Sequence, residues 1–297
     1  MSTAANTVGA PVVEERAVGL WADAFRRMRR NPAAIIGGAL VGFFLLIAIF
    51  APFIAPYDPT QGNLADSYLP PSSEHWFGTN VQGQDMFSRI IFGSRLTLGI
   101  ATLSVVVGVS VGATFGSIAG YFRGRIDAVI MRGVDIMLSI PGLLFAIAVV
   151  TFLGQGVPQI AIAIAILNVP IFARLLRGTL LGVREAEYVT AARAIGVGGR
   201  TLLARHMLPN AVGPLIVAGT LALATAVIDA AALGFLGLGP PDPRTPEWGM
   251  MLSDSYRYLN QAPFLAFFPG MAIVLSVVGF NLLGDALRES LDPKLRR

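Results

Sequence analysis

The feature that most constrains the fold of this chain is a series of long stretches that contain no charged residue. A helix that crosses a membrane needs about 20 mostly apolar residues, and uncharged stretches of this kind occur at residues 33–57, 96–122 and 264–284. Over the whole chain 54% of residues are hydrophobic and 13% are charged, against roughly 25% charged in soluble domains. The sequence therefore predicts an all-α integral membrane protein.

Two further apolar stretches complete the expected set of spans. Residues 136–173 carry no charge but are too many for one crossing, and the turn-forming segment 154–159 (Gly-Gln-Gly-Val-Pro-Gln) divides them. This pattern predicts a tight helical hairpin. Residues 211–238 are interrupted only by Asp229. Six spans result, and both chain ends then lie on the same side of the membrane.

The basic residues predict which side that is. Short cytoplasmic loops carry an excess of Arg and Lys, and of the 22 basic residues only Arg89, Arg95, Arg244 and Arg257 fall in the two long connections on the opposite side. We therefore expect both termini in the cytoplasm. The expected segments are a cytoplasmic segment 1–32, spans 33–57, 96–122, 136–153, 157–173, 211–238 and 264–284, extracytoplasmic loops 58–95 and 239–263, a cytoplasmic segment 174–210 and a tail 285–297.

The residues before the first span have the pattern of an amphipathic helix. Leu20, Trp21, Ala24, Phe25 and Met28 recur at spacings of three and four among arginines, which fits a helix lying in the inner membrane interface. A basic anchor that only fixes orientation fits the same pattern.

A segment rich in small residues, 185–209, lies between the fourth and fifth expected spans. We expect a first short helix from Glu185 to Ile195 that ends at Gly196 in a left-handed cap. A second short helix, residues 200–208, is expected to end before Pro209, whose ring disfavours helix at the preceding residue. The alanines of the first helix allow close approach either by another protein or by the spans of this chain.

This segment resembles the EAA motif of permease subunits in bacterial ABC importers, whose pattern is Glu-Ala-Ala, three residues, Gly, nine residues and Ile-x-Leu-Pro. Ala191, Ala192, Gly196, Leu208 and Pro209 are in register, whereas Thr190 replaces the glutamate and His206 the isoleucine. The resemblance implies that the segment docks on an ATPase. The residues expected to couple to the ATPase are Glu187, Thr190, Ala191, Ala192, Arg193, Gly196, Leu208 and Pro209.

Other stretches are similar to the second permease of dipeptide and oligopeptide (nickel-peptide) importers. They include residues 29–32 (Arg-Arg-Asn-Pro), 235–239 (Phe-Leu-Gly-Leu-Gly) and 246–249 (Pro-Glu-Trp-Gly). They also include an outer motif made of residues 75–80 (His-Trp-Phe-Gly-Thr-Asn), 83–85 (Gly-Gln-Asp) and 88–89 (Ser-Arg). In the outer motif Asn80 and Gln84 replace an aspartate and an arginine. The resemblance implies the six-span fold of type I ABC importer permeases and a place in the cytoplasmic membrane of a bacterium.

The same resemblance implies partners. They are a homologous permease subunit, two ATP-binding subunits or one fused double ATPase that hold ATP and Mg²⁺, and an external peptide-binding protein. We expect no cofactor, no metal and no nucleic acid on this chain itself.

The sequence also limits the chemistry of the chain. Lys294 is the only lysine and there is no cysteine, so a Gly-x-x-x-x-Gly-Lys-Ser/Thr phosphate loop and a thiolate site are both excluded. His75 and His206 are expected on opposite sides of the membrane, and the serines and aspartates form no catalytic grouping. We do not expect an enzyme.

Asp229 is the only acid well inside an expected span, where a carboxylate is costly. It is a candidate for the translocation path, and a stand-alone ion-coupled secondary transporter using Asp229 is the alternative function. A solvated or paired position near the outer end of the span is the other interpretation of this residue.

Two further patterns leave alternatives open. Gly108, Gly112 and Gly116 recur every four residues and predict a close-packing face, within the chain or against a second subunit. The long outer loop 58–95 is expected to be an ordered cap that meets the external binding protein, or a rigid lid.

Overall fold

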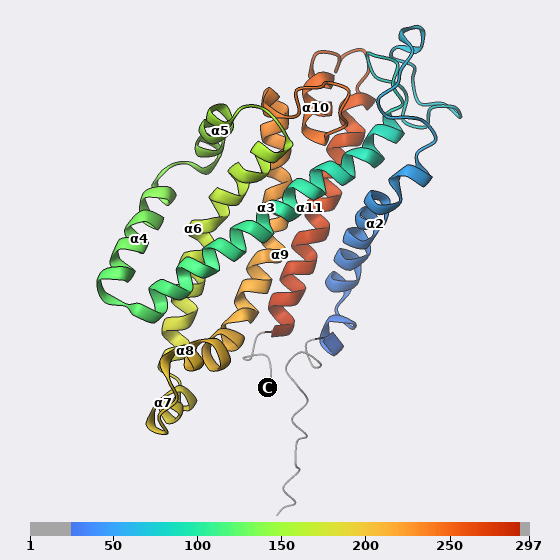
Figure 1. Ribbon diagram of the computed structural model, residues 1–297. Helices are drawn as coiled ribbons and strands as arrows, with labels where there is room; N and C mark the ends of the chain where they lie inside the picture. The colour runs from blue at the N-terminus through green and yellow to red at the C-terminus, as the bar shows by residue number, and fades with distance from the viewer. Residues whose placement is uncertain (1–24, 292–297) are drawn as a thin grey trace, which may run out of the picture.

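The computed structural model describes residues 25–291, and over this range the chain is a bundle of helices with a single isolated β-bridge between Thr79 and Asp85. Figure 1 shows long helices running side by side, with short elements gathered at both ends of the bundle. Their bounds are α2 Pro32–Ile54, α3 Met86–Phe122, α4 Gly124–Ser139, α5 Gly142–Leu153, α6 Val157–Arg184, α7 Glu187–Ala194, α8 Gly199–Thr201, α9 Leu208–Leu233, α10 Trp248–Tyr256 and α11 Phe264–Leu291, with short 3₁₀ or π turns at Leu64–Asp66, Leu202–Met207 and Gly234–Leu238.

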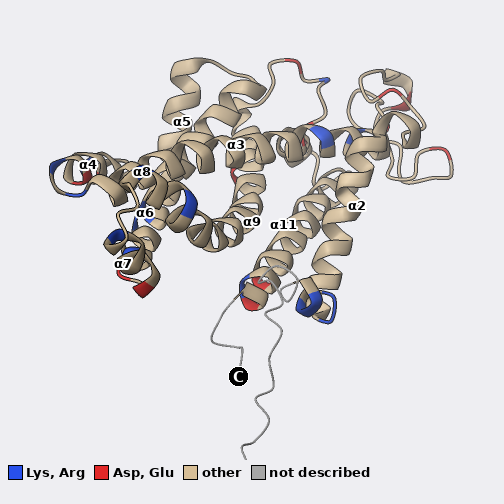
Figure 2. Cartoon of the chain, turned by 60° about the horizontal axis from the view of Figure 1, so that its bottom comes forward, with Lys and Arg blue, Asp and Glu red and all other residues tan. Residues whose placement is uncertain are grey.

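Five helices are long and apolar enough to cross a membrane, and a bent pair makes a sixth candidate span. The five are Pro32–Ile54, Met86–Phe122, Val157–Arg184, Gly199–Leu238 and Phe264–Leu291, and the pair is Gly124–Ser139 with Gly142–Leu153. The predicted all-α membrane fold is confirmed. Figure 2 shows the long bodies of α2 and α11 almost free of charged residues, which gather near helix ends.

The third expected span, 136–153, is not one helix. α4 and α5 meet at an angle of 95°, because Pro141 follows Ile140, whose backbone is extended. The turn predicted at residues 154–159 is present, and Gly154 and Gly156 occupy it with φ of 92° and 148°, which few other residues adopt without strain.

Several helices extend beyond the predicted spans. α3 begins at Met86 rather than after Arg95, because the Asp85 side chain accepts from Ser88 N and caps the helix. α6 continues from the expected end at Ala173 to Arg184. In this added part, the arginines of α6 form ion pairs with aspartates of α4, Arg177 with Asp127 and Arg174 with Asp135. α11 likewise continues past residue 284 to Leu291. The first residues of the predicted interfacial helix, Leu20, Trp21 and Ala24, lie outside the described residues.

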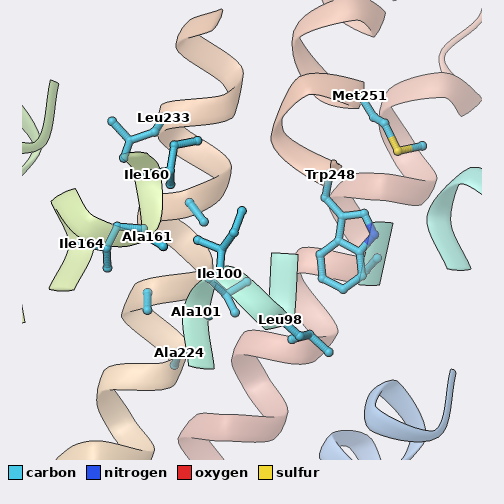
Figure 3. Close-up of a cluster of buried hydrophobic side chains, with 14 of the residues drawn as sticks. Leu98, Ile100, Ala101, Ile160, Ala161, Ile164, Ala224, Leu233, Trp248 and Met251 are labelled. Carbon is cyan, nitrogen blue, oxygen red and sulfur yellow. The ribbon is translucent and has the colours of Figure 1, made fainter. Parts of the chain in front are cut away.

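Close packing of α3 on α6 explains the glycine repeat. A Cβ at Gly108, Gly112 or Gly116 would lie 2.5–3.0 Å from backbone carbonyl oxygens or Cβ atoms of α6, so only glycine allows this approach. The intrachain interpretation of this repeat is therefore confirmed. Figure 3 shows the adjoining core, where side chains of α3, α6 and α9 meet near Trp248 and Met251 of α10.

A polar anchor holds α10 against α3. Glu247 is fully buried and accepts from Gly249 N at 3.0 Å, Met250 N at 2.8 Å and Thr97 Oγ1 at 3.2 Å. Trp248 is also fully buried and donates from its indole nitrogen to the Ile90 carbonyl at 3.0 Å. Burial, as the largest effect, raises the pKa of Glu247 above its ordinary value, and the three hydrogen bonds oppose it.

The loop between α2 and α3 is ordered by a second polar centre. Arg89 is 1% exposed, and its guanidinium donates to Gln84 Oε1 and to the Pro59 and Arg244 carbonyls, the last two at 3.0 Å. It therefore ties this loop to the connection before α10. The two substituted motif residues also bond each other, because Asn80 Nδ2 donates to Gln84 Oε1 at 2.8 Å.

Candidate functional site

The α7 helix and the turns around it form a compact unit at one end of the bundle. Figure 1 places α7 and α8 at the end where α2 begins and α11 finishes, opposite α10. Glu187 lies in the first turn of α7 and Arg193 in the last, and both charges oppose the helix dipole.

α7 ends in a Schellman motif at Gly196. The N–H of Val197 donates to the Ala192 carbonyl at 3.1 Å and the N–H of Gly196 to the Arg193 carbonyl at 3.0 Å. Gly196 has φ of 83°, so the predicted left-handed cap is confirmed.

One face of α7 packs on the chain's own helices. Val189 is fully buried and Ala192 is 9% exposed, and both belong to a cluster that α6 and α9 complete. Its buried members are Phe172, Leu176, Leu180, Val189, Ala192, Leu202, Met207, Ala211 and Leu215. A helix of 8 residues is not stable alone in water, and burial of a valine contributes about 1.5–3 kcal/mol. This face fixes α7 to the bundle.

The rest of α7 and its cap are open. Glu187, Thr190, Ala191, Arg193 and Gly196 are all exposed, and we call these five residues the α7 surface. Both interpretations of the alanines are therefore present on one helix, because Ala192 packs on this chain and Ala191 remains accessible to another protein. Of the other expected coupling residues, Leu208 packs against the buried cluster and Pro209 is exposed.

The predicted break before Pro209 is wrong. The chain continues from Gly199 through a π turn, Leu202–Met207, directly into α9, with Pro209 in the first turn of α9. The Leu208 N–H donates to the Leu203 carbonyl five residues earlier, and this wider turn accommodates a ring that would clash with the carbonyl four residues before it. The segment after α7 is therefore the beginning of a span.

Tyr188 joins α7 to this junction and was not singled out by the sequence motif. Its hydroxyl accepts from Asn210 Nδ2 at 3.1 Å, and lies 3.4 Å from the His206 carbonyl, to which it donates. Asn210 Nδ2 also donates to the His206 carbonyl at 2.7 Å. α7 is thus held to the first turn of α9 by polar contacts as well as by the buried cluster.

Two contacts hold the ends of this unit to α3. A Cβ at Gly199 would lie 2.0 Å from the Tyr121 hydroxyl, so the chain passes directly over the end of α3. Arg123 and Glu185 form an ion pair with an Nη2–Oε1 distance of 3.3 Å, and both side chains are exposed, which limits its contribution to about 0–1 kcal/mol.

Asp229 lies far from α7 on the same helix. It is 21 residues after Leu208 in the sequence, which corresponds to about 30 Å along a helix, and it is near the end of α9 at Leu233. It lines a groove of about 560 Å³ between α9, α6 and the break between α4 and α5. The structure therefore does not place Asp229 with the α7 surface, but the two are connected by α9.

The sequence contained one signal for this groove. The groove is lined by Ser139, Ile140, Pro141 and Gly142 from the break, Asn168 from α6 and Thr225 from α9. Pro141-Gly142 is a turn-forming pair inside the uncharged stretch and marks the break that separates α4 from α5. Within residues 25–291 no three His, Cys, Asp or Glu side chains are grouped as a metal site would need.

The comparisons with known proteins agree with this geometry. Residues 112–297 match the family model described as "Binding-protein-dependent transport system inner membrane component", and residues 19–71 match the "N-terminal TM domain of oligopeptide transport permease C".

The dipeptide transport system permease protein DppC of Alkalihalophilus pseudofirmus is 46% identical, over 96% of this chain and 94% of the relative. The glutathione transport system permease protein GsiD of Pectobacterium atrosepticum is 41% identical over 96% and 95%.

A solved structure shows the same fold. A chain from inward facing conformations of the MetNI methionine ABC transporter matches with a TM-score of 0.59 and 20% identity, over 70% of this chain and 98% of that one. The all-helical bundle, its membrane composition and the capped α7 at one end agree with these matches. The chain therefore belongs to the family of inner-membrane permease components of binding-protein-dependent transport systems.

Proposed function

We propose that this chain is one of two permease subunits of an ATP-driven importer of dipeptides and oligopeptides in a bacterial cytoplasmic membrane. The identity to DppC extends over nearly the whole chain and supports peptide as the solute. An external binding protein delivers the peptide, and a homologous permease completes the path. ATP and Mg²⁺ are held by two ATPase subunits, or by one fused double ATPase.

The α7 surface is the ATPase docking site in this proposal. The observation that carries the proposal is the division of α7 into a face that is anchored by Val189 and Ala192 and a face that is open at Ala191 and Thr190. A partner bound to the open face of α7 moves α7 together with α6 and α9, because the other face of α7 is packed on these two helices. Closure of the ATPase pair then rocks the spans between outward and inward access.

α9 carries this movement toward the path. Since α7 is bonded to the first turn of α9 through Tyr188 and Asn210, displacement of α7 displaces α9 and the groove at Asp229. Asp229 is the candidate path residue. The alternative, an ion-coupled secondary transporter that uses Asp229, leaves an exposed and anchored α7 without a role, and family membership favours the importer.

Affinity purification of the tagged full chain from native membranes, followed by mass spectrometry, tests the proposal. We expect a second permease and an ATPase to co-purify with the wild type and with Ala191→Ser, and the ATPase to be lost with Ala191→Arg, which adds bulk to the open face. Recovery of this chain alone from wild-type membranes, or of the ATPase with Ala191→Arg, would contradict it.

A further inference from the structure

The groove beside Asp229 contains a carboxylate without a partner. Asp229 is partly buried, and in the part of the chain that the structure describes no hydrogen bond or ion pair reaches it. No arginine or lysine lines the groove. A carboxylate in a span normally pairs with a cation or faces an aqueous cavity, and this one faces a groove of about 560 Å³.

The other polar groups of the groove present oxygen acceptors. The hydroxyls of Ser139 and Thr225 donate to carbonyls of their own helices, those of Ile136 at 2.7 Å and Ala222 at 3.0 Å. Asn168 Nδ2 donates to the Ile164 carbonyl at 2.9 Å. The two hydroxyl donors are directed at backbone oxygens, so the hydroxyl oxygens of Ser139 and Thr225 remain available as acceptors, and Asn168 keeps its amide oxygen and one N–H.

The break in the third span presents two helix ends to the groove. α4 ends at Ser139 and α5 begins at Gly142, and both residues line the groove. The negative end of one helix dipole and the positive end of the other therefore lie side by side and largely offset each other. The charge of the groove is that of Asp229, and the carboxylate with the hydroxyl oxygens favours a cation.

We propose that this groove is a cation subsite of the translocation path, in which Asp229 pairs with the ammonium group of the transported peptide. The apolar walls, among them Leu143, Phe145 and Leu167, surround the pair, and the volume lies in the usual range of about 300–1,000 Å³ for small-molecule sites. This inference rests on the proposed function, since it assumes that the groove opens on the peptide path.

Charge-selective labelling tests the subsite without requiring transport. The natural chain has no cysteine, so Thr225→Cys, one helical turn from Asp229, provides a single thiol in the groove. Its rates of reaction with a cationic methanethiosulfonate (trimethylammonium-ethyl) and an anionic one (sulfonato-ethyl) are measured in the assembled complex, in membrane fragments open on both faces. Thr151→Cys, an exposed threonine on α5 outside the groove lining, is the matched control.

We expect the ratio of cationic to anionic rates for Thr225→Cys to fall at least about tenfold when Asp229→Asn is added, because one charge about 6 Å away speeds the cationic reagent and slows the anionic one by about threefold each even at the dielectric constant of water. Addition of Asp229→Glu should preserve the ratio, and the Thr151→Cys ratio should not change. An unchanged ratio with Asp229→Asn would overturn the proposal and would indicate that a residue of the partner permease neutralises the carboxylate. Absence of labelling at both Thr225→Cys and Ile171→Cys, on the opposite wall, would also overturn it.

Uptake of a dipeptide from saturating loaded binding protein provides the second measurement. Asp229→Asn should lower uptake by about tenfold or more while ATP hydrolysis remains within about twofold of wild type, and Asp229→Glu should retain most uptake. Wild-type uptake by Asp229→Asn would overturn the subsite. Absence of ATP-driven uptake in the wild type would instead contradict the proposed function, and the labelling result would remain valid.

Discussion

The side-chain amide of Asn210, in the first turn of α9, donates a hydrogen bond to the hydroxyl of Tyr188 on α7 with an Nδ2–Oη distance of 3.1 Å. It joins the helix with the exposed α7 surface to the helix that carries Asp229. The buried cluster of Val189, Ala192 and Leu202 lies beside it. These contacts couple movement of α7 to the start of α9.

Tyr188→Phe should weaken coupling and leave the fold intact. The substitution keeps the ring and removes the hydroxyl contacts to Asn210 and His206, each worth about 0.5–1.5 kcal/mol. We expect uptake to fall roughly two- to tenfold at an unchanged rate of ATP hydrolysis, measured together in proteoliposomes. Tyr256→Phe is the control, because Tyr256 is 66% exposed on α10 at the other end of the bundle. Equal uptake by Tyr188→Phe and wild type would show that the hydroxyl does not couple the helices.

Gly196 and Gly198 form a matched pair for the role of the α7 cap. A Cβ at either position would meet no atom within 4 Å, but Gly196 has φ of 83° and Gly198 has φ of −61°. Gly196→Ala should therefore strain the cap by about 1–2 kcal/mol and lower uptake, whereas Gly198→Ala should not.

Gly196→Arg adds bulk on the exposed side of the same cap. We expect it to abolish uptake while the chain still inserts in the membrane, as judged by immunoblot of the membrane fraction. Normal uptake by this variant would be incompatible with docking at α7.

Gly112 and Gly99 separate close packing from helix propensity on α3. A Cβ at Gly112 would lie 2.6 Å from the Val169 carbonyl oxygen, whereas a Cβ at Gly99 would meet no atom within 4 Å. Gly112→Ala should destabilise the chain by about 1–3 kcal/mol through overpacking, and Gly99→Ala should stabilise it by about 0.5–1 kcal/mol. Thermal unfolding of the purified chain in detergent measures both, and equal shifts in Tm would contradict close packing of α3 on α6.

Glu247 gives the fold a pH dependence of predictable sign. Burial raises its pKa in the folded protein, so its contribution favours the folded state most below the unfolded pKa, about 4.3, and is lost as pH rises through the folded pKa. The Tm of the wild type relative to Glu247→Gln should therefore increase when the pH is lowered from about 7 to about 5. A difference in Tm that is constant over this range, or that decreases on acidification, would refute the assignment.

The sequence predicted the membrane fold well because span length and charge are local properties. Uncharged stretches located the helix bodies, and Gly154 and Gly156 marked the turn between α5 and α6. Helix ends were less predictable, because α3 begins at Met86 through the Asp85 cap and α6 reaches Arg184 through ion pairs with α4. In the sequence alone, a charged residue indicates the end of a span. Here the charged side chains are paired or form a cap, so the helices continue past them.

The site was predicted from spacing and therefore only in part. The positions of Ala191, Ala192 and Gly196 identified α7 and its cap, but which alanine is exposed depends on how α7 rotates against α6 and α9. Tyr188 and Asn210 are 22 residues apart in the sequence. They meet because the π turn Leu202–Met207 lets the helix continue through Pro209, which places Asn210 in the first turn of α9. The groove at Asp229 likewise needs the break at Pro141, which a uniform apolar stretch conceals.

The most direct measurement of the central claim is peptide uptake by proteoliposomes that contain the purified complex of this chain with its co-purified partners. The account predicts uptake that requires ATP on the side of the membrane where the ATPase is bound and loaded binding protein on the opposite side. This uptake should persist when ionophores abolish all ion gradients, and it should be lost with Ala191→Arg. Uptake that follows an ion gradient without ATP, in the wild type and in Ala191→Arg alike, would contradict it.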